Sequence, residues 1–366
     1  MTTFATPVVQ SGLEGVVAFA TQIAEPDREG GALRYRGVDI QDLVGVVPYE
    51  QVWGLLVDGT LNPGLAAPVE PLPLPVRSGD ARVDVQAALA LLGVAGDGLR
   101  LGQLIDISDE QARVDLARAS ATALSFTAES ARGAGRPAVP QRDVDRGRTL
   151  AERFLIRWRG EADQRHARAI DAYWVSAAEH GINASTFAAR VVASTGADVG
   201  AALSAAVGAL SGPLHGGAPS RVLSMLDEVE RTGDAGRWVR AALDRGERLM
   251  GFGHRIYRAE DPRARVLRRT ARELGSPRVA VAEELERAAL AELRARKPDR
   301  VLATNVEFWS AVVLDLAAVP PELFTAMFAC ARVAGWSAHV LEQKREGRLI
   351  RPTAAYVGPG PRALGG

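Results

Sequence analysis

Three of the five histidines in the sequence stand in unusual surroundings. His215 lies in SGPLHGGAPS and His254 lies in MGFGHRIYRAEDPRA, so glycines flank both and let the backbone come close to a ligand. His180 ends a predicted helix just before GINASTFAAR. A single histidine of this kind is most often a satisfied core or loop residue. Two glycine-flanked histidines in one chain favour a functional site.

The spacing of the histidines argues against a metal centre. No two of them stand four residues apart, and no carboxylate is placed as in the HExxH motif of zinc enzymes. We therefore expect no metal site.

A carboxylate precedes an apolar helix face in TNVEFWSAVVLDL. Asn305 and Glu307 stand at a loop-to-helix junction, where acidic residues commonly stabilise the first turn of a helix. Phe308 and Trp309 follow directly, and a carboxyl group in an apolar pocket acquires the raised pKa that suits a general base. The sequence leaves both interpretations open.

Three arginines, Arg263, Arg332 and Arg351, lie in or beside apolar stretches and not in solvated charge runs. A guanidinium group binds a carboxylate through two parallel hydrogen bonds, so each arginine could pair with a carboxylate of the protein or of a substrate. Taken alone, each arginine is more often found in a salt bridge within the protein than bound to a substrate. With the histidines and a carboxylate, the set suits acid–base chemistry at a carbon of a polycarboxylate, but the spacing does not identify the reaction.

The elements that must position these residues are mostly helices. Apolar residues recur at helical spacing from Asp84 almost to the end, which predicts a mostly α architecture with little sheet. Short extended pieces and turns are expected over the first 45 residues, and a loop over 62–82. The predicted helices cover 48–58, 84–92, 108–131, 141–159, 164–180, 184–196, 198–211, 220–231, 235–247, 262–274, 279–296, 307–317 and 320–346, the last one split near Gly335.

The predicted helix over 198–211 is apolar nearly all round and rich in alanine and glycine. Such a helix should be buried on several sides, either in the centre of the core or at a subunit interface.

The composition narrows the class of protein. The 366 residues include 44 Lys and Arg against 44 Asp and Glu, so no net field recruits nucleic acid or an anionic membrane. The single cysteine, Cys330, excludes a disulfide framework and points to a reducing compartment. The apolar runs are too short to span a bilayer, and the first 20 residues do not read as a signal peptide. We expect a soluble cytoplasmic protein whose partner is a small molecule or a protein.

Seven segments, taken in order and with their spacing, resemble the citrate synthase family, in particular its short dimeric type and an actinobacterial branch with a second citrate synthase. They extend from about residue 12 to residue 359 and read GLEGVVAFATQI, LRYRGVDIQDL, HGINASTFAARVVASTGAD, GALSGPLHGGA, MGFGHRIYRAEDPRA, NVEFW and ARVAGWSAHVLEQK with RLIRP.

The resemblance implies a mostly helical homodimer in which residues 1–218 and 319–366 form a large domain and residues 219–318 form an inserted small helical domain. The active site would lie in the cleft between the two domains. It also implies condensation of acetyl-CoA with oxaloacetate and water to citrate and free CoA, through an enol or enolate and citryl-CoA. No metal or prosthetic group would take part.

The resemblance also implies roles for individual residues. His215 would hydrogen-bond the thioester carbonyl, His254 would polarise the oxaloacetate ketone, and Glu307 would remove a methyl proton from acetyl-CoA. Four residues would bind oxaloacetate: His180, Arg263, Arg332 and Arg351, the last from the partner subunit. Two more, Arg258 and Asn305, would lie near CoA.

Glu307 departs from the family pattern, which has an aspartate at this position. The extra methylene moves the carboxylate by roughly an ångström, and misplacement on that scale can cost about 10²-fold in rate. We expect a slower enzyme or a shifted backbone near Thr304. Two alternatives stay open: a 2-methylcitrate synthase that uses propionyl-CoA, and a catalytically weakened paralogue that binds citrate or CoA as a sensor or interaction protein.

Overall fold

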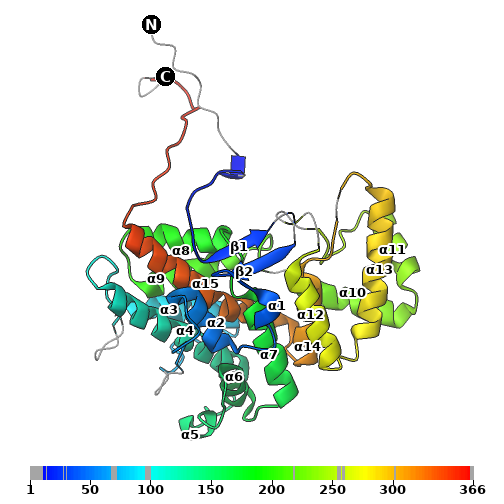
Figure 1. Cartoon of the computed structure of the whole chain (residues 1–366), viewed down its shortest axis with the longest axis horizontal. Coiled ribbons are helices and arrows are strands. Elements are labelled where there is room, and N and C mark those ends of the chain that lie inside the picture. Colours follow the sequence, from blue (N-terminus) through cyan, green and yellow to red (C-terminus); the bar gives the residue numbers. More distant parts are fainter. Residues whose placement is uncertain are drawn as a thin grey trace.

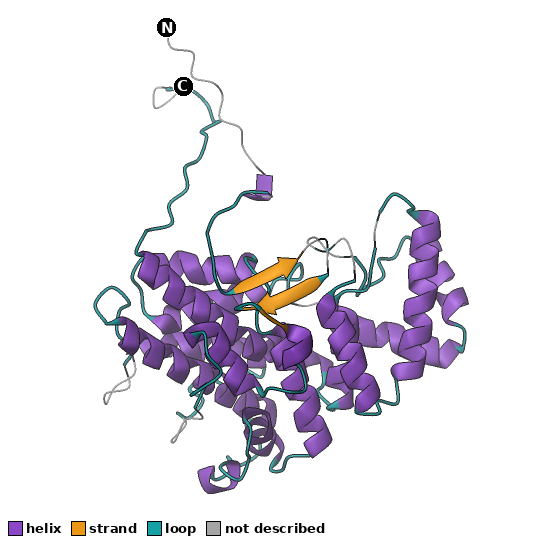
Figure 2. Ribbon diagram, in the orientation of Figure 1, coloured by secondary structure: helices purple, strands orange, loops and turns teal. Residues whose placement is uncertain are grey.

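The computed structural model describes residues 11–13, 15–27, 29, 31–66, 72–94, 100–216, 219–253, 257, 260–300 and 302–362. This part of the chain is mostly helical, with one small sheet against the helical body (Figures 1 and 2). The predicted architecture is confirmed.

The sheet is antiparallel, in the order β1 (Ala24–Asp27), β2 (Ala32–Tyr35) and β3 (Val38–Asp39). Ala24 lies opposite Tyr35, and Arg34 lies opposite Asp39. Alternate residues of β2 point into the body, which buries Leu33 and Tyr35. The short extended pieces expected near the N-terminus are confirmed over these strands.

Fifteen α-helices are described, and most fall on predicted spans. They are α1 (Ile40–Leu43), α2 (Tyr49–Asp58), α3 (Ala81–Leu91), α4 (Asp109–Arg132), α5 (Gln141–Val144), α6 (Leu150–Arg159), α7 (Gln164–Ala177), α8 (Ala184–Ser194), α9 (Val199–Leu210), α10 (Pro219–Thr232), α11 (Ala235–Asp244), α12 (Pro262–Glu273), α13 (Val279–Arg296), α14 (Val306–Leu316) and α15 (Phe324–Glu346). Many begin at a side-chain cap, such as Asn183 for α8 or Asp261 for α12.

Two predicted boundaries are wrong. The single helix expected over 141–159 is divided into α5 and α6, because the backbone at Gly147 approaches Arg153 too closely for a side chain and Thr149 caps a new helix. The expected split near Gly335 does not occur. Gly335 lies within α15 because the helix presses there against the end of α7, where a Cβ would come within 2.6 Å of the carbonyl oxygen of Ala178.

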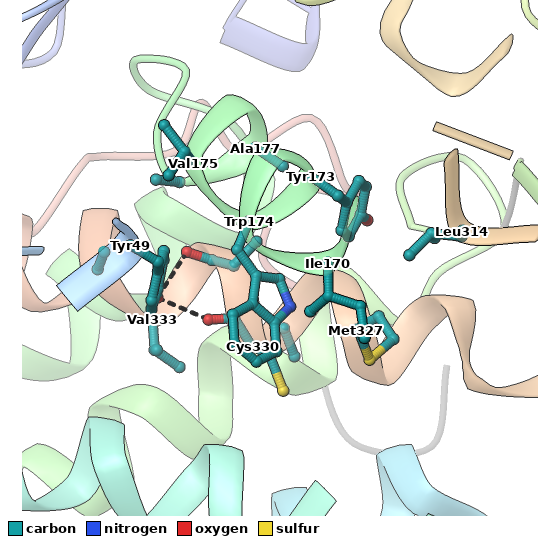
Figure 3. Packing of buried hydrophobic residues seen from close by; sticks show 14 of the residues in the cluster. Tyr49, Ile170, Tyr173, Trp174, Val175, Ala177, Leu314, Met327, Cys330 and Val333 are labelled. Carbon is teal, nitrogen blue, oxygen red and sulfur yellow. Dashed lines mark hydrogen bonds between the residues drawn. The ribbon is translucent and has the colours of Figure 1, made fainter. Parts of the chain in front are cut away.

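α15 is the central helix of the core and packs against α2, α4, α7, α8 and α9 (Figure 1). The hydroxyl of Tyr49 on α2 lies 2.7 and 3.0 Å from the carbonyl oxygens of Cys330 and Ala331 on α15 (Figure 3). The ring of Trp174 packs 5.4 Å from that of Tyr49. These contacts join segments that lie far apart in the sequence, and they hold in place the α7 and α15 side chains that form the site.

α9 is buried on one face only. Leu203, Val207 and Leu210 are fully buried, and the helix packs against α3, α8 and α15. The opposite face, with Ala201 and Gly208, is half-buried. The prediction of a core helix is confirmed for the first face.

α10, α11 and α13 pack against one another at one end of the molecule, to the right in Figure 1. α12 and α14 lie between this group and α7. The division into a large and an inserted small domain stays a prediction. In the described part of the chain, no helix is both long and apolar enough to span a membrane.

Candidate active site

A cleft of about 410 Å³ lies where the end of α7, the start of α8, the start of α14 and the middle of α15 meet. Six of the nine predicted site residues line it: His180, His215, Arg263, Asn305, Glu307 and Arg332. Residues from the chain between 173 and 332 thus converge on one cavity with a mixed polar and apolar lining.

The other three predicted residues are not placed in this cleft. His254 and Arg258 lie outside the described residues. Arg351 is exposed on the C-terminal segment that follows α15 and extends away from the body (Figure 1).

His215 is held by Ser185 at the start of α8. The Ser185 hydroxyl oxygen lies 2.9 Å from Nε2 of His215 and 2.8 Å from Oδ1 of Asn183, and it accepts a hydrogen bond from Nε1 of Trp336 at 3.2 Å. Burial, aided by the charge of Arg332, lowers the pKa of His215 to about 4. The imidazole is therefore neutral at physiological pH, so one ring nitrogen donates a hydrogen bond and the other accepts one.

Glu307 occupies the first turn of α14 but does not cap it. Asn305 is the cap, and its Oδ1 accepts from the backbone N–H of Glu307 at 3.0 Å. Phe308 and Trp309 are fully buried behind it. Burial raises the pKa of Glu307 to about 7, although Arg263 and Arg248 pull it down. A carboxyl group with this pKa can act as a base near neutral pH.

Arg263 forms the internal ion pair that the sequence left open. Its Nε and Nη2 lie 3.0 and 2.8 Å from the two carboxylate oxygens of Asp261, the cap of α12. Asp261 also accepts from the backbone N–H of Val306 at 3.1 Å. This carboxylate therefore fixes Arg263 and ties the start of α12 to the start of α14.

Arg332 lies across the cleft on α15 and is only 1 % exposed. Its Nε donates to the carbonyl oxygen of Ala177 at 3.0 Å, and its guanidinium carbon lies 4.9 Å from the ring centre of Phe328. Its Nη1 is buried and has no hydrogen-bond partner within the described ranges. A buried charged donor without an acceptor is costly, so Nη1 is able to take an acceptor from a ligand in the cleft.

Several residues that support the site were not predicted from the sequence. Nε2 of His180 lies 2.9 Å from the hydroxyl of Tyr257, and burial raises the pKa of that hydroxyl well above its usual range. Ser185 and Arg248 were also missed. Tyr257 shares the glycine-flanked segment of His254, and Ser185 follows the helix cap Asn183, so both stood close to residues that had been singled out.

The sequence profile of the family "Citrate synthase, C-terminal domain" matches residues 12–68 and 74–353. The chain belongs to the citrate synthase family. It is an enzyme of the acyltransferase class to which citrate synthases belong. The chain is 66% identical over 353 residues to a protein of Mycobacterium tuberculosis that is provisionally named citrate synthase 2, with 96% of this chain and 94% of that protein covered. A 2-methylcitrate synthase of Shewanella oneidensis is 31% identical, with 97% and 96% covered.

Solved citrate synthase structures share the fold. The enzyme from Pyrobaculum aerophilum superposes with a TM-score of 0.85 at 32% identity, covering 97% of this chain and 94% of that one. The citrate synthase of Thermoplasma acidophilum, solved as a ternary complex with carboxymethyl coenzyme A and oxaloacetate, has a TM-score of 0.81 at 28% identity and covers 98% of both chains. The multi-helical fold expected from the sequence segments is confirmed.

Proposed function

We propose that this citrate synthase family member condenses acetyl-CoA with oxaloacetate and water to give citrate and CoA. The observation that carries the proposal is the buried Nη1 of Arg332, which has no hydrogen-bond partner among the described residues. It lies in a cleft shared with a neutral imidazole and a carboxyl group whose pKa is about 7. A dicarboxylate supplies the missing acceptor. The neutral imidazole and the carboxyl group supply the donor and the base that enolisation needs.

Proton transfer is assigned to Glu307 and His215. Glu307 accepts a methyl proton of the acetyl group, since its raised pKa brings it close to the operating pH. His215 donates a hydrogen bond to the thioester oxygen as negative charge develops there, a contribution typically worth about 10²–10³ in rate. Oδ1 of Asn183 and Nε2 of His215 compete for the single proton of the Ser185 hydroxyl. When this proton points to Nε2, the ring proton of His215 resides on Nδ1 and is available to the thioester oxygen.

Oxaloacetate binding is assigned to Arg332, Arg263 and His180, with His254 polarising the ketone. Asn305 and Arg258 are assigned to the CoA side. The chemistry calls for no metal or prosthetic group, because guanidinium and imidazole groups provide the charge stabilisation. The cytoplasmic location stays a prediction.

We propose a homodimer in which Arg351 enters the partner's cleft. The half-buried face of α9 consists of small residues, Ala201, Ser204, Ala205 and Gly208, which permit close approach of a second helix. The backbone N–H of Ile350 donates to the hydroxyl of Ser194 at 3.1 Å. This bond ties the start of the C-terminal segment to the end of α8.

A second candidate is 2-methylcitrate synthesis from propionyl-CoA. The Shewanella oneidensis relative of that name covers nearly the whole chain. The chemistry is the same, and one methylene in an apolar pocket discriminates by only about 1–3 kcal/mol.

The decisive experiment measures release of CoA thiol with oxaloacetate and either acetyl-CoA or propionyl-CoA, in the wild type and in Glu307→Gln. Faster turnover of acetyl-CoA, abolished by the substitution, supports citrate synthesis. Faster turnover of propionyl-CoA supports the second candidate. No release from either thioester, together with a thermal shift on adding oxaloacetate, would mean that the fold serves binding alone.

A further inference from the structure

Glu179 is a fully buried carboxylate, 0 % exposed, that the proposed reaction does not use. It directly precedes His180 at the end of α7. Its Oε1 lies 3.3 Å from Nε2 of His339 on α15, whereas its Oε2 is buried and has no hydrogen-bond partner among the residues that the structure describes. A buried carboxylate is stable as an anion only where a cation compensates its charge.

The contact between His339 and Arg190 identifies His339 as neutral. Nη1 of Arg190 lies 3.2 Å from Nδ1 of His339, and a guanidinium group can only donate. Nδ1 therefore accepts, and the single ring proton sits on Nε2, which faces Glu179. Arg190 is itself balanced by Glu342 and Glu346 at 2.6 and 2.9 Å. Neither His339 nor Arg190 thus supplies the charge that Glu179 needs.

Arg332 is the cation that acts on Glu179. Burial raises the pKa of Glu179, whereas the hydrogen bond from His339, the charge of Arg332 and the backbone N–H of His180 act to lower it. Burial lowers the pKa of Arg332, and the charge of Glu179 opposes this. Nη1 of Arg332 and Oε2 of Glu179 each stay without a hydrogen-bond partner in the described ranges, so the two groups interact through space.

Gly335 keeps the space for this carboxylate. A Cβ at Gly335 would lie 2.6 Å from the carbonyl oxygen of Ala178 and even closer to Oε2 of Glu179. The backbone N–H of Gly335 donates to that same carbonyl at 3.1 Å, and Nε of Arg332 donates to the carbonyl of Ala177 at 3.0 Å. These two bonds fix α15 on the end of α7, and with it the separation of Arg332 from Glu179.

We propose that Glu179 is a positioning residue that compensates the charge of Arg332 through space and leaves the Nη1 donor available to a substrate carboxylate. This inference rests on the proposed function, since the ligand concerned is oxaloacetate. A direct ion pair would occupy the donor, whereas a through-space partner does not. The same negative charge repels the incoming dianion, so Glu179 also keeps oxaloacetate binding from becoming too tight.

The first test measures the Kd of oxaloacetate by titration calorimetry in the wild type, Glu179→Gln and Glu179→Asp. The glutamine keeps the shape and the oxygen that accepts from His339, but it removes the charge. We expect Glu179→Gln to bind oxaloacetate about fivefold or more tightly and to melt at a lower temperature without ligand, while Glu179→Asp keeps a Kd near that of the wild type. A residue with a merely structural role would lower the melting temperature and leave the Kd unchanged or raise it, and that result would overturn the proposal.

The second test is a double-mutant cycle on the melting temperature of the ligand-free protein, with Glu179→Gln, Arg332→Met and the double variant. We expect the double variant to lose less than the sum of the two single losses, because no unbalanced charge is left buried. If Glu179→Gln alone does not fold, recovery in the double variant gives the same support. Additive losses, or no recovery, overturn the proposal.

The two tests separate this inference from the proposed function. If the double-mutant cycle shows coupling but the wild type does not bind oxaloacetate, the proposed function is refuted and the charge pair stands. If the wild type binds oxaloacetate, but the losses of melting temperature are additive and Glu179→Gln leaves the Kd unchanged, the charge pair is refuted and the proposed function stands.

Discussion

The hydroxyl oxygen of Ser185 lies 2.9 Å from Nε2 of His215, at the first turn of α8. Ser185 is buried, and Trp336 donates to the same oxygen from α15. The orientation and the protonation of the imidazole therefore depend on a residue that does not line the cleft.

Ser185→Ala should lower kcat by about 10- to 100-fold, by analogy with the loss found when the hydrogen-bond partner that orients a metal-bound histidine is removed. The oxaloacetate KM should change little, because Ser185 itself does not line the cleft. Steady-state kinetics of CoA release measure both. Thr195→Ala, which removes an exposed hydroxyl at the other end of α8, is the matched control, and an equal loss of kcat in both variants would refute the role of Ser185.

The activity should fall at acid pH because Glu307 must be ionised to accept a proton. With its pKa raised to about 7, log kcat/KM for acetyl-CoA should decline by about one unit per pH unit below that value. Titration of the rate between pH 5 and 9 checks this. A profile that stays flat down to pH 5 would remove Glu307 from the role of base.

The same pKa predicts an effect on stability. A carboxyl group whose pKa is higher in the folded than in the unfolded protein binds its proton more tightly when folded, so its contribution is present at low pH and is lost as the pH rises through about 7. Glu307→Gln should therefore raise the melting temperature at pH 8 and have little effect near pH 4. Thermal melts at the two pH values measure the difference, and a destabilised variant at pH 8 would contradict it.

Asp261→Asn should raise the oxaloacetate KM by at least about tenfold, because it breaks the bidentate pair that positions Arg263. It should also lower stability, since Asp261 caps α12. Asp234→Asn is the matched control, because Asp234 caps α11 through the backbone N–H of Arg237 and lines no part of the cleft. The control should share only the loss of stability. A rise in KM with Asp234→Asn as well would point to a general effect of weakened caps.

The proposed exchange of Arg351 between subunits predicts complementation. Arg351→Gln and Glu307→Gln should each be nearly inactive, yet a refolded equal mixture should recover up to about a quarter of the wild-type activity, because half of the dimers are mixed and each mixed dimer has one intact site. The rate of CoA release before and after mixing measures this. Absence of recovery in mixed dimers, verified by two distinguishable affinity tags, would place Arg351 in the cleft of its own chain or outside any site.

The sequence predicted the helices where the apolar period was long and the caps were explicit, as for α12 after Asp261-Pro262. It failed at Gly147 and Gly335 for opposite reasons. Gly147 stands at a tight backbone turn between two helices, whereas Gly335 stands inside a helix where another element presses close. Both residues are glycines, and only the segment that packs against each one in the folded protein decides whether it separates two helices or lies within one.

The residues of the candidate site were predictable by type but not by partner. His180, His215, Glu307 and Arg332 were singled out from their surroundings, and they line one cleft. The groups that act on these residues were not predicted. The Ser185 hydroxyl beside His215, the Glu179 carboxylate that acts on Arg332 and the Tyr257 hydroxyl beside His180 come from distant segments or from motifs without a distinctive pattern. A single sequence carries no signal that pairs such residues.

The place of α15 in the chain has a consequence for biosynthesis. The helix on which α2, α4, α7, α8 and α9 pack occupies residues 324–346 of 366. The bond from Tyr49 to Cys330, for example, spans 281 residues. During translation the earlier helices are therefore made before the central helix on which they pack, and their apolar faces stay uncovered until residues 324–346 follow. The helices α10, α11 and α13 pack against one another and all precede α15 in the chain, so this group can assemble before the central helix closes the rest of the core.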